Sequence, residues 1–251
     1  ECSAMSSNIL GDHFDIHCGG VDNMFPHHEN EIAQSICATG KKFVNYWLHS
    51  EFLLVDGGKM SKSLGNFYRI ADLKDLGFSA ESIRYQLLSG HYRTKISFSI
   101  DKKYESDKIV QRITDFHSLL EQKNAGQLSD GSFPDAYEDF KASMNDDLDT
   151  PRALAIFLEW MKSANKRIKD IRITDTEIGQ AWTFLTSFNS IFGFVQEGEL
   201  DIPDEIQLLL NSRRQARDEK DWARSDALRT TLRKYGWKVE DTQDGQKLKK
   251  V

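Results

Sequence analysis

The sequence predicts a chain of class α/β plus mostly α: an α/β segment, then a long helical region, then a small basic end. The first observation is a short apolar run that ends in two glycines at residues 14–20, a pattern typical of open α/β sheets that approach a ligand closely. The second is a helical repeat of apolar residues that begins near residue 106. The third is a gathering of cations and aromatic residues after residue 201. A length of 251 residues accommodates two or three such modules.

The composition narrows the class of protein. A formal net charge of -6 argues against a surface that is basic throughout, although 33 lysines and arginines can still cluster on one face. No run approaches the ~18 apolar residues that a membrane span needs, and the first residues lack the pattern of a signal peptide. Three irregularly spaced cysteines argue against a disulfide framework and favour a metal or catalytic use. We therefore expect a cytoplasmic protein without membrane segments.

The first segment contains two short strand patterns, at residues 14–17 and 44–49, and a helix that we expect to begin at Pro26. Trp47 lies in the second strand pattern, where it either packs in a core or contacts a ligand. The glycines that follow the first strand allow close approach to the backbone, although such a pair is more often an ordinary turn.

A candidate metal site lies in the same segment. His27 and Glu31 are four residues apart, so on a helix their side chains share one face. An imidazole and a carboxylate placed in this way can bind a metal ion together or form an ordinary hydrogen-bonded pair. Cys2 can add a thiolate if a strand carries it into the same site.

Residues 56–66, DGGKMSKSLGN, form the most specific motif of the chain. Two lysines three residues apart, among glycines and small hydroxyl residues, can close their charges and backbone N–H groups around a polyphosphate. A bare pair of lysines at this spacing is more often part of a solvated turn. The longer run KMSKS followed by LGN resembles the signature loop of class I aminoacyl-tRNA synthetases, whose two lysines stabilise the pyrophosphate leaving group of ATP. This resemblance makes Lys59 and Lys62 the expected catalytic residues.

The middle of the chain is predicted to be helical. Residues 79–90 have a capping serine at Ser79, an apolar stripe and a terminal glycine, and they predict a short helix. We assign no catalytic role to Arg93, which follows this helix, because a lone arginine can equally be a structural cation. Three further stripes predict a bundle: Ile109, Ile113, Phe116 and Leu120; Leu154, Phe157, Met161, Ala164 and Ile168; and Ile178, Trp182, Leu185, Phe188 and Phe192.

The sequence also predicts the loops and helix ends that connect this bundle. Residues 124–134, rich in glycine, serine and aspartate, predict a loop. Thr150-Pro151 favours the start of the helix that carries the second stripe. Gly193 favours the end of the helix that carries the third stripe. Residues 144–151 are acidic but lack the pattern of a calcium loop, so we interpret them as a solvated turn that caps the next helix.

The last fifty residues combine positive charge with aromatic side chains. Pro203 favours the start of another helix, and eight cations follow it: Arg213, Arg214, Arg217, Lys220, Arg224, Arg229, Arg233 and Lys234. Cations neutralise phosphates and aromatic faces stack on unpaired bases, so an RNA-binding surface and a solvated amphipathic helix are both open interpretations. Residues 236–241 and 246–248 can pair as a hairpin, and we expect residues 247–251 to form a flexible tail.

Several blocks together resemble the cysteinyl-tRNA synthetase family: ECSAM, HCGGVDNMFPHHENEIAQS, VNYWLHS, DGGKMSKSLGN and RDEKDWARSDALR. The resemblance is dense over residues 1–93. It implies the C-terminal part of a Rossmann-like class I catalytic domain at 1–70, a connector and stem-contact region at 71–105, a DALR-like helical bundle at 106–200 and a small anticodon-binding domain at 201–251. It also implies an incomplete polypeptide, because the HIGH-type histidine motif of class I enzymes is absent from these residues, and a monomer.

The resemblance further implies the site residues. One Zn²⁺ per chain is held by Cys2, His27 and Glu31, with a further cysteine from outside these residues, and the substrate thiolate joins the ion. ATP, accompanied by Mg²⁺, is bound by His17, Gly19, Gly20, Lys59, Met60, Ser61, Lys62 and Ser63. The substrate is contacted by Asp22 and Trp47, and the anticodon by Arg217, Trp222, Asp226 and Asp241. Cys18 departs from the family, which usually has a third glycine there, and we expect it to point away from the nucleotide.

The implied activity is that of a cysteine–tRNA ligase, with tRNA(Cys), L-cysteine and ATP as partners. We expect the chain alone to be inactive without its N-terminal half. Two alternatives stay open: a ligase of the same family that attaches cysteine to an amino sugar, and a non-catalytic tRNA-binding fragment. An amino-sugar ligase has no use for an anticodon reader, and a binding fragment has no use for the metal residues.

Overall fold

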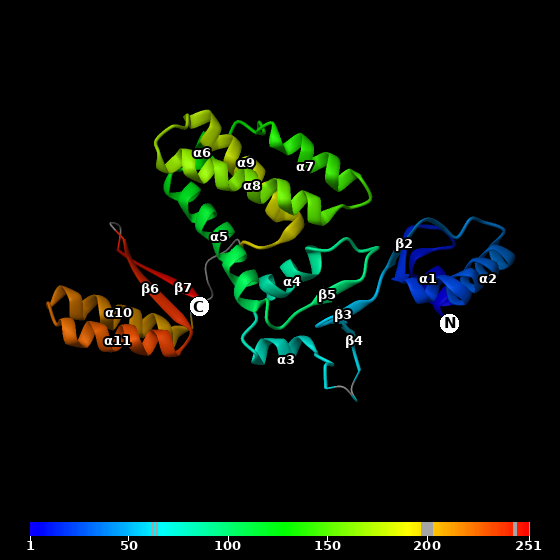
Figure 1. Cartoon of the computed structure of the whole chain (residues 1–251), viewed down its shortest axis with the longest axis horizontal. Coiled ribbons are helices and arrows are strands. Elements are labelled where there is room, and N and C mark those ends of the chain that lie inside the picture. Colours follow the sequence, from blue (N-terminus) through cyan, green and yellow to red (C-terminus); the bar gives the residue numbers. More distant parts are fainter. Residues whose placement is uncertain (62, 64, 197–202, 243–244, 251) are drawn as a thin grey trace. The chain divides into compact units, whose positions relative to one another are not determined.

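The structure is a computed structural model that describes the chain except for residues 62, 64, 197–202, 243–244 and 251 (Figure 1). It consists of two compact units, residues 1–195 and 196–251. The first unit contains the predicted α/β segment and the helical bundle, and the second contains the basic end. The finer module boundaries at residues 70, 105 and 200 stay predictions.

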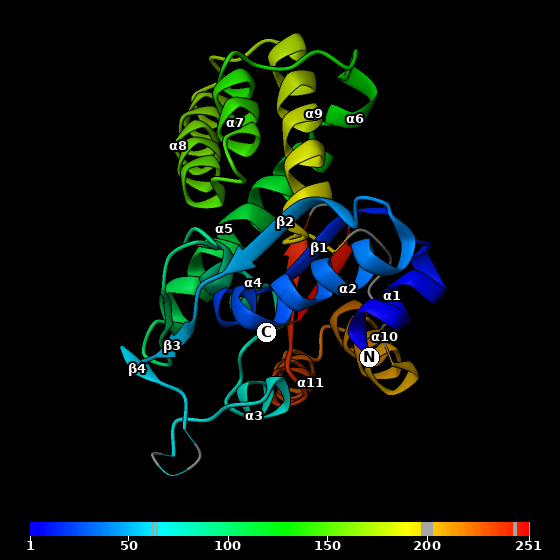
Figure 2. The same ribbon diagram turned by 90° about the vertical axis from the view of Figure 1, so that its right-hand side faces the viewer.

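The N-terminal segment contains a parallel pair of strands, β1 (Phe14–Gly20) and β2 (Val44–Ser50). The register places His17 opposite Trp47, so two predicted site residues lie side by side across the pair. Helices α1 (Cys2–Leu10) and α2 (Glu29–Thr39) pack against each other and lie beside the strands in both views (Figures 1 and 2). Between β1 and α2 the chain forms two short turns, η1 (Val21–Asn23) and η2 (Met24–His28).

Two local predictions for this segment are wrong. Cys2 lies at the start of helix α1, not on a strand. Helix α2 begins at Glu29, three residues after the expected start at Pro26, and Pro26, His27 and His28 belong to the preceding turn η2, which also contains the extended Phe25 (φ -136°, ψ 131°). The Phe25–Pro26 peptide bond is cis.

A small three-stranded sheet follows, in the order β4 (Gly58–Lys59), β3 (Leu53–Val55) and β5 (Ile96–Phe98). Helices α3 (Ile70–Asp75) and α4 (Ala80–Leu88) accompany it. The hydroxyl of Ser79 accepts a hydrogen bond from the backbone N–H of Ser82, which confirms the predicted cap of α4. A core of Leu73, Phe78, Ile83 and Phe98 holds sheet and helices together.

The helical bundle comprises α5 (Lys103–Gln122), α6 (Ala125–Leu128), α7 (Ala136–Asn145), α8 (Thr150–Lys169) and α9 (Asp175–Phe192). The three predicted apolar stripes lie on α5, α8 and α9 and form its core. Gly193 ends α9 in the left-handed conformation (φ 61°), as predicted. The loop predicted for residues 124–134 is wrong in part, because it contains α6. Ala125 is fully buried, and this apolar contact stabilises a helical turn among polar residues.

The N-terminus of α9 carries a capping box. The hydroxyl of Thr174 accepts from the N–H of Glu177 at 3.3 Å, and the Glu177 carboxylate accepts from the N–H of Thr174 at 2.9 Å. Arg167 also donates to this carboxylate. The N–H of Thr174, followed by Arg167, lowers the pKa of Glu177 from 4.5 to about 2.

We expect Glu177→Gln to destabilise the bundle by about 1 kcal/mol at pH 7 and by much less at pH 2.5. A carboxylate whose pKa is lowered on folding contributes stability above its unfolded pKa and loses it as the pH falls toward the folded pKa. Glutamine mimics the protonated acid, so the two proteins converge at low pH. Thermal unfolding of both proteins across this pH range measures the effect, with the exposed Glu159→Gln on α8 as control. An equal loss at both pH values contradicts the prediction.

The second unit consists of two helices and a hairpin. Helices α10 (Asp204–Asp218) and α11 (Trp222–Lys234) pack against each other, and β6 (Trp237–Thr242) pairs with β7 (Gly245–Lys250) in antiparallel register. Ile206, Leu232, Trp237, Val239 and Leu248 form its core. The predicted hairpin and the start of α10 after Pro203 are confirmed. The flexible tail is wrong for residues 247–250, which belong to β7, and Val251 lies outside the described residues.

Candidate functional site

The predicted metal residues converge in the structure. One ligand atom each from Cys2, His27 and Glu31 lies within 4.8 Å of the others, although the residues come from α1, η2 and α2. Nε2 of His27 is 3.8 Å from Oε2 of Glu31. Glu31 is only 3% exposed, whereas Cys2 and His27 are exposed. The cluster therefore has a buried carboxylate at its base and two nitrogen or sulfur donors open to solvent.

Glu31 is an unusual buried acid. Nε2 of His17 donates a hydrogen bond to its Oε2 at 3.0 Å, and Nε2 of His28 lies 3.9 Å from the same atom. Its other oxygen, Oε1, is buried and has no hydrogen-bond partner among the residues that the structure describes. An unpaired carboxylate oxygen in the interior is costly, and a cation removes that cost. Thiolate, imidazole and carboxylate are the donors that Zn²⁺ takes in proteins, so these residues fit a zinc ion.

Sequence reasoning gave no role to His28 and His49, which line the same site. His28 is buried, and its Nδ1 lies 2.8 Å from Nε2 of His49 on β2. Burial, followed by the neighbouring His17, lowers the pKa of His28. A Cβ at Gly19 would lie 2.6 Å from the His28 ring, so this glycine is needed for the ring to approach β1. The glycine pair was the sequence signal for this contact, but it did not identify the contacting residue.

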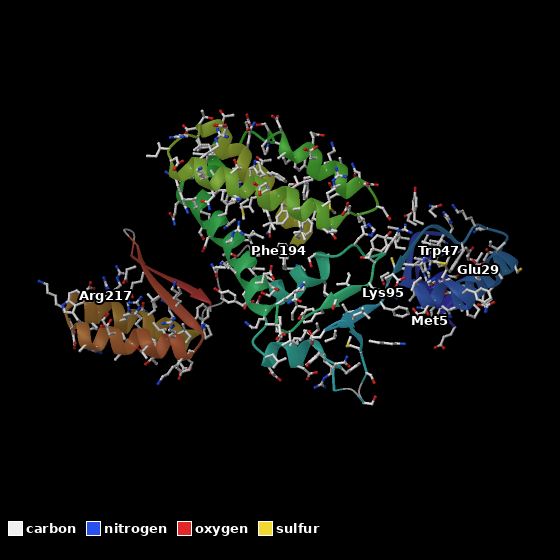
Figure 3. The ribbon with its side chains drawn as sticks, viewed as in Figure 1. Met5, Glu29, Trp47, Lys95, Phe194 and Arg217 are labelled. Atoms are coloured by element: carbon white, nitrogen blue, oxygen red, sulfur yellow. The ribbon has the colours of Figure 1, made fainter. Side chains whose placement is uncertain are left out.

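Trp47 belongs to the aromatic wall of this site. Its ring centroid lies 4.9 Å from that of His17 and 4.9 Å from that of His28, and it is stacked on His49 at 6.1 Å. Figure 3 places Trp47 beside the N-terminal helices, with Glu29 on the neighbouring α2. Packing is thus one function of Trp47. Substrate contacts by Trp47 and by the exposed Asp22 stay predictions.

The lysine-serine loop, residues 56–66, is held in shape by its own Asn66. The N–H of Ser61 donates to Oδ1 of Asn66 at 2.8 Å, and Nδ2 of Asn66 donates to the carbonyl oxygen of Lys59 at 3.2 Å. The hydroxyls of Ser61 and Ser63 are 2.7 Å apart. Lys59 is exposed at the end of β4, where its Nζ lies 5.8 Å from the centroid of the Phe52 ring. Lys62, the second predicted catalytic lysine, lies outside the described residues.

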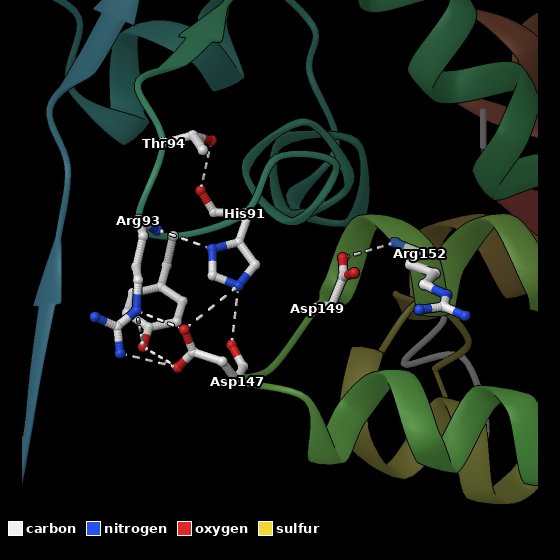
Figure 4. Close-up of polar contacts among 7 residues, drawn as sticks. His91, Arg93, Thr94, Asp147, Asp149 and Arg152 are labelled. Atoms are coloured by element: carbon white, nitrogen blue, oxygen red, sulfur yellow. Dashed lines mark hydrogen bonds and ion pairs between the residues drawn. The ribbon is translucent and has the colours of Figure 1, made fainter.

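The connector is fastened to the acidic turn before α8 (Figure 4). Nε of Arg93 donates to Oδ2 of Asp147 at 2.5 Å, and the hydroxyl of Tyr92 donates to Oδ1 at 2.6 Å. The Arg93 guanidinium, followed by Tyr92, lowers the pKa of Asp147. Asp149 accepts from the N–H of Arg152 at 3.1 Å and caps α8, as predicted. Arg93 is therefore a structural cation, and Asp147, although exposed to solvent as expected for this turn, is its ion-pair partner.

The predicted RNA-binding residues lie in the second unit. Nη1 of Arg217 donates to Oδ2 of Asp241 at 3.1 Å, and its guanidinium lies 5.8 Å from the ring centroid of the exposed Trp222. Asp226 follows Trp222 by one turn of α11 and is exposed. The structure thus brings Arg217, Trp222 and Asp241 together. The sequence analysis counted Arg213 among eight cations that can neutralise phosphates, but the structure buries it against Asp241.

Comparison with known proteins identifies the domains of the chain. Three family models match successive parts of the chain: the tRNA synthetases class I (C) catalytic domain at residues 1–108, the DALR domain at residues 139–196 and the cysteinyl-tRNA ligase anticodon binding domain at residues 200–247. The chain is therefore a class I synthetase catalytic-domain fragment followed by DALR and anticodon-binding domains, which confirms the predicted fold class.

Curated relatives narrow the family. The cysteine–tRNA ligase of Chlamydia felis is 42% identical over 260 residues, which cover 100% of this chain and 54% of the relative. That of Brachyspira hyodysenteriae is 39% identical over 262 residues, covering 100% of this chain and 55% of the relative. The chain belongs to the cysteinyl-tRNA ligase family, and it spans about half the length of the curated relatives that it matches.

A solved structure supports the fold alone. LeuRS from Agrobacterium radiobacter K84, in its ternary complex with tRNA and LeuAMS, superposes with a TM-score of 0.56 at 17% identity. The match covers 71% of this chain and 25% of LeuRS. None of the helices in the described part of the chain has the length and apolar character needed to cross a membrane.

Proposed function

We propose that this chain forms part of a cysteine–tRNA ligase, which activates L-cysteine with ATP and transfers it to tRNA(Cys). The observation that carries the proposal is the meeting of Cys2, His27 and Glu31, in which the Glu31 carboxylate is buried and has an unpaired oxygen. This donor set suits recognition of a thiol, and it occurs in a chain of the cysteinyl-tRNA ligase family. A cytoplasmic, monomeric protein completes the proposal.

The cysteine pocket is built on the Cys2, His27 and Glu31 cluster. When bound there, a zinc ion supplies a Lewis acid that takes a thiolate in preference to a hydroxyl, so cysteine is separated from serine without an editing site. Glu31 is oriented for this by the hydrogen bond from His17. In our proposal Asp22 receives the substrate ammonium, and Trp47 closes the side of the pocket.

The nucleotide is held by the glycine-rich end of β1 and by the lysine-serine loop. We assign ATP contacts to His17, Gly19, Gly20, Lys59, Met60, Ser61, Lys62 and Ser63, with Mg²⁺ accompanying ATP. Lys59 and Lys62 neutralise the pyrophosphate as the cysteine carboxylate attacks the α-phosphate. Catalysis of this kind depends on positioning and charge stabilisation, and the Asn66 bridge pre-arranges the backbone around Lys59.

The second unit is the proposed anticodon reader. Trp222 offers an exposed ring for stacking on a base, and Arg217, Asp226 and Asp241 offer donors and acceptors around it. The anticodon-binding family match at residues 200–247 favours tRNA over an amino sugar as the acceptor of cysteine. We also propose that the 251 residues alone do not activate cysteine, because they contain no HIGH-type histidine motif.

Transfer of labelled cysteine to tRNA(Cys), with serine as competitor, tests the proposal. We expect charging by the full polypeptide that carries these residues and no ATP–pyrophosphate exchange by the 251-residue chain alone. In the full polypeptide, Lys59→Ala should lower the exchange rate by about 10²–10³-fold, because one preorganised charge at the leaving group is lost. The control is Lys41→Ala, which removes an exposed ion pair with Asp12. Charging with serine, or equal activity of the two variants, refutes the assignment.

A further inference from the structure

Arg213 is a buried arginine in a unit whose other cations are mostly at the surface. It lies on α10 and is 1% exposed, which makes it one of the largest fully buried side chains of the described structure. Arginine is almost never buried to this extent unless it is paired. Its partners therefore reveal what it does.

Those partners lie at the end of the hairpin. Nη1 of Arg213 donates to Oδ1 of Asp241 at 3.0 Å and Nη2 donates to Oδ2 at 3.1 Å, a two-pronged pairing that only a guanidinium can make. Nη1 also donates to Oε1 of Gln246, which lies opposite Asp241 in the β6–β7 register. Arg213 thus fastens both strands of the hairpin to α10. Its Nε is buried and unpaired within the described residues, so the pairing with Asp241 dominates its orientation.

The contact continues to the surface through Asp241. Oδ2 of Asp241 also accepts from Nη1 of Arg217, and the Arg217 guanidinium lies over the Trp222 ring. The exposed fraction of the side chain rises from 1% at Arg213 to 37% at Arg217 and 39% at Asp241, and Trp222 is 58% exposed. The four residues form a continuous path from the interior of the unit to its surface, where Figure 3 labels Arg217 on the helical pair.

The charges along this path favour an ionised Asp241 that is held between arginines. Asp241 faces Arg213 and Arg217 at hydrogen-bond distance, and Arg229 on α11 also acts on it. The hydrogen bond from Arg213, more than any other cause, lowers the pKa of Asp241 and keeps it ionised. An ionised carboxylate only accepts hydrogen bonds, so Asp241 can hold both arginines at once, with its Oδ2 shared between Arg213 and Arg217.

We propose that Arg213 is a positioning residue for single-stranded RNA: it fixes Asp241, and Asp241 in turn fixes Arg217 against Trp222. The inference rests on the proposed anticodon-reading function of this unit. Arg217 is a flexible side chain, and holding it before RNA arrives removes part of the ordering cost of binding. Arg213 therefore sets the affinity for the RNA loop without touching the RNA, and it acts mainly through Arg217 and Trp222, two of the groups proposed to meet the bases.

The test is a double-mutant cycle on the full chain, read by fluorescence anisotropy of a labelled tRNA(Cys) anticodon stem-loop. Arg213→Lys keeps the charge but loses the two-pronged pairing, and we expect it to weaken binding by about 5- to 10-fold. In an Arg217→Ala background the same substitution should have a much smaller effect, because Arg217 is the main group through which Arg213 acts. The matched control is Arg214→Lys, an exposed neighbour on α10, which should change binding less than twofold in either background. An equal loss from Arg213→Lys in both backgrounds indicates a merely structural residue and overturns the proposal.

A second measurement does not depend on RNA. The indole N–H signal of Trp222, identified with Trp222→Phe, should shift in the NMR spectrum of Arg213→Lys but not in that of Arg214→Lys. An unchanged signal overturns the proposal that Arg213 positions Arg217 against Trp222, whether or not the stem-loop binds. Failure of the stem-loop to bind the native chain would instead refute the anticodon function itself. If Arg213→Lys unfolds the unit, Gln246→Ala removes the other partner of Arg213 with a smaller loss of packing. It should weaken stem-loop binding mainly when Arg217 is present, and a loss independent of Arg217 again overturns the proposal.

Discussion

Glu31→Gln should lower the affinity of the chain for Zn²⁺ by more than about 100-fold. Substitutions of groups that only orient zinc ligands cost about 10–100-fold, and Glu31 would contribute a ligand atom itself. The neutral amide keeps the shape of the side chain but loses the charge and the second anionic oxygen. The affinity is measured by competition with a chromophoric chelator, and the amount of bound zinc by elemental analysis of the dialysed protein.

Two further variants sharpen this prediction. Glu29→Gln on the first turn of the same helix removes an exposed acid, and it should leave zinc affinity unchanged. His17→Ala removes the hydrogen bond to Oε2 of Glu31 and should cost about 10–100-fold. The substitution at Glu31 should not destabilise the zinc-free chain, because it removes a buried charge with an unpaired oxygen. Zinc retained at full affinity by Glu31→Gln would exclude the cluster as a metal site.

The features that were predictable from the sequence rest on local signals. The stripes of α8 and α9 repeat with the helical period, and Ser79 and Gly193 terminate helices through contacts within a few residues. The meeting of Cys2, His27 and Glu31 came from a resemblance and not from spacing. Spacing alone gave the His27–Glu31 pair, and in the structure His27 lies on η2 while Glu31 lies on the first turn of α2.

The features that were missed depend on contacts between distant positions. His28 meets His49 across 21 residues, Arg93 meets Asp147 across 54, and Arg213 meets Asp241 across 28. No local pattern distinguishes a buried arginine in a basic helix from its exposed neighbours. The start of α2 was missed for a different reason: proline favours the first turn of a helix, but here Pro26 lies in the separate short turn η2 that precedes α2.

Phe157→Ala should destabilise the helical bundle by about 3–5 kcal/mol and lower its melting temperature by roughly 6–20 °C. Phe157 on α8 is fully buried, and its ring is stacked on that of Phe188 with a centroid distance of 3.6 Å and an interplanar angle of 4°. The Phe184 ring meets it edge-on at 5.2 Å. Truncation to alanine removes these contacts and leaves a cavity that the neighbouring aromatic rings, which are held by one another, fill only in part. Thermal and urea unfolding followed by circular dichroism measure the loss.

The comparison that gives this number meaning is with Ile191→Ala on α9, an exposed apolar residue of the same bundle, which should cost no more than about 0.5 kcal/mol. Phe157→Leu should fall between the two, because leucine refills most of the volume but loses the stacking on Phe188. If Phe157→Ala proved no more harmful than Ile191→Ala, the bundle would not depend on its aromatic core. The apolar stripes on α8 and α9 would then indicate only that these segments are helical. They would not indicate side-chain packing between the two helices.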